Sequence, residues 1–114
     1  MNMDQTAFDQ LLDSMKEPML KTLREWVKVP SLKDTPEENA PFGASLRRML
    51  DLVINDCRAL GFETQDYGGY AADAKMGMGS DEDALGILAH VDVVPAGDGW
   101  TREPFGAQLE GNVL

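Results

Sequence analysis

Near the start of the chain, apolar residues recur every three or four positions, which is the pattern of a helix with one apolar face. This face consists of Phe8, Leu11, Leu12, Met15, Met19, Leu23, Trp26 and Val27. Pro18 interrupts the pattern, and a proline inside a helix removes a backbone donor and clashes with the preceding turn. We therefore expect a kink or two abutting helices near residues 16–19, and a helix end near Val29, before Pro30.

A second helical pattern follows a polar loop that contains prolines. Its apolar positions are Phe42, Leu46, Met49, Leu50, Val53, Ile54, Cys57 and Leu60. Pro41 suits the opening of a helix, and Gly61 stands where a left-handed residue would end it. This spacing predicts a helix from Pro41 to about Leu60, with Cys57 as a small buried residue.

Short runs separated by turn residues come next and predict strands. The runs are FETQDY, AADAKMG and DALGILAHVDVV, and MGMGS predicts a hairpin turn. Residues 106–114 predict a further strand or hairpin with its turn at Glu110, Gly111 and Asn112. The order of helices and strands favours an α/β layered fold with helices packed on a sheet. Because the chain stops inside a predicted strand, we expect it to be part of a longer protein.

Composition narrows the possible partners. The 114 residues suit one ordinary domain, and 10 basic against 20 acidic side chains give a net charge of -10, which repels nucleic acid and anionic membranes. The single cysteine cannot form an internal disulfide, and the N-terminus lacks the basic and apolar regions of a signal peptide. No apolar run approaches about 18 residues. We expect a cytoplasmic protein with neither a nucleic-acid nor a membrane partner.

The apolar run at residues 85–89 leads into the only histidine of the chain, His90, with Asp92 two positions on. Side chains two apart on a strand point to the same side, with Cα atoms roughly 6.5–7 Å apart. An imidazole can bind a metal through one nitrogen while a carboxylate holds the other N–H. A lone histidine at a strand end is more often a satisfied structural residue, and one histidine does not make a metal site.

The longer stretch GILAHVDVVPAGDGWTREPFG resembles the first metal-ligand motif of the M20 family of zinc metallopeptidases, nearest to its PepV-like dipeptidases. The resemblance extends over nearly the whole chain through WVKVPS, APFGASLRRMLDLVINDCRALGFE and YGGYAADAKMG. It implies that His90 is a zinc ligand and that Asp92 is a catalytic acid that orients the histidine and the metal. It also implies two zinc ions in a complete active site.

The fold implied by the resemblance is the N-terminal part of a helix-flanked mixed-sheet, zinc-peptidase-like catalytic domain. Residues 1–114 would form this portion, and the rest of the catalytic domain and a lid domain would lie outside the chain. The implied activity is hydrolysis of peptide bonds in short peptides by metal-activated water. Because the general base and the other ligands have no matching positions, the 114-residue chain alone is predicted to be inactive.

Two other interpretations stay open. One is a deacylase or carboxypeptidase of the same family, acting on N-acyl amino acids. The other is a non-catalytic, truncated α/β module in which the His90–Asp92 pattern is a relic. In either case an unpaired strand edge and exposed apolar surface would favour self-association.

Overall fold

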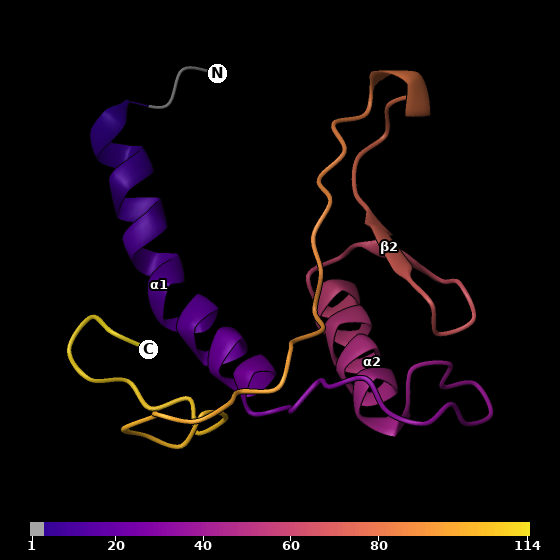
Figure 1. The fold of residues 1–114 in the computed structure, drawn as a ribbon. Helices are drawn as coiled ribbons and strands as arrows, with labels where there is room; N and C mark the ends of the chain where they lie inside the picture. The colour runs from indigo at the N-terminus through magenta and orange to yellow at the C-terminus, as the bar shows by residue number, and fades with distance from the viewer. Residues whose placement is uncertain (1–3) are drawn as a thin grey trace. The chain divides into compact units, whose positions relative to one another are not determined.

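The structure is a computed structural model that describes residues 4–114. The chain divides into two units, which we name the α1 unit (residues 4–28 and 100–114) and the α2 unit (residues 29–99). The regular elements are α1 (Gln5–Val27), α2 (Ala44–Ala59), β1 (Glu63–Asp66), β2 (Ala72–Lys75) and the short 3-10 helix η1 (Asp81–Asp83), as Figure 1 shows. The described chain is therefore mixed α/β, as predicted.

The first helix is continuous through Pro18, so the alternative of two abutting helices is wrong. Asp4 caps its start by accepting a hydrogen bond from the Ala7 N–H at 2.7 Å. The helix ends at Val27, two residues before the predicted end. Met19, Leu20 and Lys21, which follow Pro18, are good helix formers and favour continuation of the helix beyond the proline.

Much of the predicted apolar face of α1 is open to solvent. Six of its side chains are between 44% and 60% exposed, namely Phe8, Leu11, Leu12, Met15, Met19 and Leu23. Within the same unit, Arg24 Nε donates to the carbonyl oxygen of Ala107 at 2.9 Å, and Ala107 is buried. At the end of the chain, where a strand or hairpin was predicted, the structure has a single β-bridge between Glu110 and Val113 that closes a tight turn.

The second helix begins at Ala44, three residues after the predicted start. Pro41 lies instead in a turn that the Gly43 N–H closes on the Ala40 carbonyl at 3.0 Å. The predicted C-terminal cap is confirmed, because Gly61 has a φ of 90°. The Gly61 N–H bonds to Arg58 and the Phe62 N–H bonds to Cys57, both at 3.0 Å, which is the Schellman arrangement.

The small core of the α2 unit contains Val29, Ala40, Met49 and Ile54, each at most 5% exposed. Cys57 is only half-buried, so its predicted full burial is wrong. The helix packs on β1 and β2, which pair antiparallel in a register that matches Glu63 with Lys75 and Asp66 with Ala72. These two strands confirm the first two predicted runs.

The third predicted strand is wrong for this chain. Residues 84–98 have no regular secondary structure and run as an extended segment after η1 (Figure 1). Leu85, Ile87 and Leu88 are 89%, 87% and 100% exposed. A run that is apolar on both faces is typical of a strand covered on both sides. Within residues 4–114 the two strands pair only with each other, and the high exposure of the run shows that no other element covers its faces.

Neither α-helix within residues 4–114 combines the length and the apolar character that crossing a membrane requires.

Candidate metal-binding site

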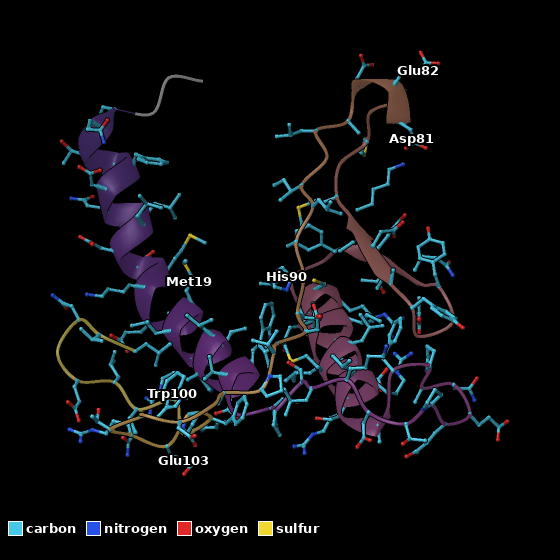
Figure 2. The ribbon with its side chains drawn as sticks, in the orientation of Figure 1. Met19, Asp81, Glu82, His90, Trp100 and Glu103 are labelled. Carbon is cyan, nitrogen blue, oxygen red and sulfur yellow. The ribbon has the colours of Figure 1, made fainter. Side chains whose placement is uncertain are left out.

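His90 lies on the extended segment of the α2 unit that follows η1 (Figure 2). It is in contact with Asp92, two residues further along this segment. The Nδ1 atom of His90 lies 3.1 Å from the Asp92 carboxylate oxygen Oδ1 and 3.1 Å from the Asp92 carbonyl oxygen. Both side chains are open to solvent, with 84% of His90 and 65% of Asp92 exposed. The predicted placement of the two side chains on one side is confirmed.

The partners of His90 fix its tautomer. A carbonyl oxygen and an ionised carboxylate oxygen can only accept hydrogen bonds, so Nδ1 is the donor to both. In the neutral imidazole this leaves an unprotonated lone pair on Nε2. A histidine whose Nδ1–H is held by an acid and whose Nε2 is free is arranged as metal-binding histidines are. The pair therefore fits one metal ligand together with its orienting acid.

A full set of ligands is not present in this part of the protein. Within residues 4–114 no three His, Cys, Asp or Glu side chains gather closely enough to hold a metal ion. A catalytic zinc ion needs three protein ligands. His90 and Asp92 can thus contribute to such a site and do not complete one.

Ser31 is the functional candidate that the sequence interpretation missed. Its side chain is 3% exposed, and its hydroxyl donates to the Val91 carbonyl at 2.7 Å. Its own carbonyl accepts the Val93 N–H at 3.0 Å. The signal in the sequence is a hydroxyl residue directly after Pro30, at the start of the polar loop between the two predicted helices. Its partners lie 60 residues away, which no local pattern reveals.

A cavity of about 290 Å³ adjoins Asp92 within the α2 unit. Its lining is mainly apolar and consists of Lys33, Phe42, Leu46, Leu50, Gly69, Val91 and Asp92. Lys33 supplies the one basic side chain of that lining. Asp92 thus stands between open solvent on one side and an apolar wall on the other.

Arg47 of α2 holds the turn between β1 and β2. Its Nη1 lies 2.8 Å from Asp66 Oδ2, and its Nη2 pairs with Asp51. The Gly69 N–H also donates to Asp66 Oδ1 at 2.8 Å. This backbone hydrogen bond, together with the Arg47 guanidinium, lowers the pKa of Asp66, while the bond to Asp51 leads the causes that raise the pKa of Arg47. The cluster fixes a cavity wall, because Gly69 is part of the lining.

Comparison with known proteins gives the chemistry a context. No family model matches the chain. The chain is 33% identical over 105 residues to the Beta-Ala-Xaa dipeptidase of Lactobacillus delbrueckii subsp. lactis, a match that covers 90% of this chain and 22% of that protein. The chain is related to dipeptidases.

Two further relatives agree with this. A Bacillus subtilis protein with the provisional name dipeptidase YtjP is 35% identical over 96 residues, which is 82% of this chain and 20% of that protein. A Staphylococcus epidermidis protein, provisionally named a dipeptidase, is 39% identical over 98 residues, covering 84% and 20%. The chain therefore spans about a fifth of the length of these three relatives, each of which is named a dipeptidase.

Proposed function

We propose that residues 1–114 form the N-terminal portion of the catalytic domain of a zinc-dependent dipeptidase of the M20 family, which hydrolyses short peptides in the cytoplasm. The observation that carries the proposal is the His90–Asp92 contact, which leaves Nε2 free, within a chain related to dipeptidases over 90% of its length. The remaining four-fifths of such a protein would supply the rest of the catalytic domain and the lid domain.

In this proposal His90 would hold one of two zinc ions through Nε2. Asp92 keeps the Nδ1 proton and the ring orientation through its carboxylate, at 3.1 Å. A bound zinc ion supplies Lewis acidity that polarises a peptide carbonyl and activates water for attack. The general base and the other ligands come from residues after Leu114, so the 114-residue chain alone binds zinc weakly and cleaves nothing.

The alternatives make different predictions. A deacylase or carboxypeptidase of the same family would use the same pair and differ in substrate, and the names of the relatives favour the dipeptidase. A non-catalytic module would need no further ligands, which agrees with the incomplete set within residues 4–114. In each case the exposed apolar residues at 85–88 favour self-association of the isolated chain.

Zinc calorimetry tests the proposal on the 114-residue chain and on a longer product that continues beyond Leu114. His90→Ala is the test variant. Asp81→Asn is the matched control, because it removes an exposed acid on the same unit that pairs with Lys75 rather than with His90. Tight zinc binding and dipeptide cleavage by the longer product alone, both lost in His90→Ala, are expected.

Other outcomes count against the proposal. Zinc binding that survives His90→Ala in the longer product would reject the assigned ligand. Hydrolysis of N-acyl amino acids without dipeptide cleavage would favour the deacylase. Absence of zinc binding in both proteins would favour the non-catalytic module.

A further inference from the structure

We propose that Ser31 is a positioning residue for the His90–Asp92 pair. This inference rests on the proposed role of His90 as a zinc ligand. It concerns the backbone on both sides of Asp92, which Ser31 holds through two hydrogen bonds.

The two hydrogen bonds are arranged as in a parallel β-bridge, except that a side-chain hydroxyl takes the place of one backbone N–H. In a parallel ladder, a residue bonds through its N–H and its C=O to the residues before and after its partner. Ser31 binds the Val91 carbonyl and the Val93 N–H in this way, at 2.7 Å and 3.0 Å, so that Asp92 is the residue opposite it. The hydroxyl takes the place of the Ser31 N–H, because that N–H donates to the Val29 carbonyl at 2.8 Å.

Burial makes the hydroxyl hard to replace by water. Ser31 is the one polar residue classed as buried within residues 4–114, with 3% of its surface exposed. If the hydroxyl were removed, the Val91 carbonyl would lose its donor at a position where water has little access. The backbone at Asp92 would then be free to rotate at one of its two flanking peptides.

Ser31 and its two hydrogen bonds to the backbone around Asp92, which we call the clamp, are linked in turn to the second helix. Ser45, in the first turn of α2, donates its hydroxyl to the Pro30 carbonyl at 2.6 Å. Val29, on the other side of Pro30, is 5% exposed and belongs to the core of the unit. The backbone at Pro30 and Ser31 is thus held on one side by α2 and the core, and it is bonded on the other side to the backbone around Asp92.

This arrangement accounts for the difference between the two ends of the extended segment. Leu85, Ile87 and Leu88 are almost fully exposed, whereas the backbone at residues 91–93 is bonded to a buried residue. His90 stands at the boundary, and it contacts both the carboxylate and the carbonyl oxygen of Asp92. Because both acceptors belong to Asp92, the conformation of that residue determines where the imidazole is held.

The test uses the 114-residue chain, in which His90 is the only histidine and its ring signals in NMR spectra are unambiguous. We compare wild type, Ser31→Ala and Ser14→Ala at fixed pH. Ser14 is a matched control, because its exposed hydroxyl on α1 also donates to a backbone carbonyl, that of Leu11 at 2.6 Å. The readouts are the zinc dependence of the His90 ring signals, the three-bond couplings that report its side-chain rotamer, and hydrogen exchange of the Val93 amide.

Ser31→Ala is expected to weaken zinc binding at His90 by about tenfold, as loss of an outer-shell partner does. The same variant should average the rotamer couplings and speed up Val93 exchange, and Ser14→Ala should change none of the three. If Ser31→Ala lowers the circular dichroism of the helices, Ser31→Cys replaces it. That variant keeps the side-chain shape with a somewhat larger atom and offers a weaker donor, and it should shift the same readouts in the same direction.

The two proposals can fail separately. If zinc in large excess does not affect the His90 ring signals of wild type, the weak zinc binding assigned to His90 in the 114-residue chain fails, while the couplings and Val93 exchange still report on the hydrogen bonds of Ser31. If wild type binds zinc and the folded Ser31 variants bind it equally well with unchanged rotamer couplings, Ser31 is a structural residue only and the inference is overturned.

Discussion

Replacing Gly69 by alanine tests how the turn between β1 and β2 is held beside the site. Gly69 has a φ of 79°, a conformation that L-residues rarely adopt. A Cβ at this position would lie 2.8 Å from the Asn39 carbonyl oxygen and 2.9 Å from Pro41 Cδ. Gly61 is a matched control, because its φ is 90° and a Cβ there would meet nothing within 4 Å. Both variants place alanine at a positive φ, and only Gly69→Ala also creates a steric clash.

The magnitude follows from these two contributions. Alanine in the left-handed region costs about 1–2 kcal/mol. The stiffer unfolded chain returns about 0.4–1 kcal/mol of this. Gly61→Ala should therefore lower the free energy of unfolding by about 1 kcal/mol. At Gly69 the clash with backbone and a proline ring adds about 1–3 kcal/mol, as overpacking does. Gly69→Ala should thus destabilise the chain by about 2–4 kcal/mol.

Urea unfolding followed by the far-ultraviolet circular dichroism of the helices measures both variants. Equal slopes against urea would show that the same surface unfolds and that the free energies can be compared. If both variants lost the same free energy within about 0.5 kcal/mol, the close approach of residues 39–41 to Gly69 would be refuted. A larger loss of unfolding free energy in Gly61→Ala than in Gly69→Ala would contradict the assignment of the steric clash to Gly69.

Arg47→Met should destabilise the chain by about 1–2 kcal/mol in urea unfolding, because it leaves Asp66 without its half-buried ionic partner. Hydrogen bonds from the Gly69 N–H and from Arg47 lower the pKa of Asp66, so its contribution to stability is present above the unfolded pKa of about 3.9 and is lost as pH falls through the lower folded value. Acid titration of stability between about pH 5 and pH 2 should accordingly be shallower in Arg47→Met than in wild type. Asp92→Asn in a longer, zinc-binding product should weaken zinc affinity about 10–100-fold by calorimetry, and unchanged affinity would reject its orienting role. Leu88→Lys places a charge on a fully exposed apolar position and should reduce self-association in sedimentation experiments, whereas the same oligomer distribution as wild type would exclude residues 85–88 from the contact.

The elements that the sequence predicted well are those with local causes. The second helix combines apolar spacing with a glycine in the left-handed conformation, and the N–H groups of Gly61 and Phe62 make the two bonds of a Schellman cap. The contact between His90 and Asp92 also follows from spacing, because residues two apart in extended backbone face the same side. In each case the atoms that decide the structure lie within a few residues of one another.

The misses have non-local causes. The apolar run before His90 has the composition of a covered strand, but within residues 4–114 β1 and β2 pair only with each other and no element covers the faces of the run. Ser31 was missed because its partners at Val91 and Val93 are far away in sequence. For Pro18 the sequence predicted a kink or two abutting helices, and the structure has one helix that continues through it.

The position of His90 links metal binding to the folding of the segment before it. Toward Asp92 the backbone is held by a buried serine, and toward Leu88 it is solvated and has no ladder hydrogen bonds. A strand that paired with residues 85–89 would restrict the free side of His90, and so would a metal bound at its Nε2. Two events that order the same residue favour each other, because whichever happens first has already met part of the entropic cost of the second. On the proposed function, the residues after Leu114 should therefore raise zinc affinity by ordering this segment as well as by adding ligands. Zinc should in turn slow amide exchange at residues 85–89 in the longer product and leave it unchanged in His90→Ala.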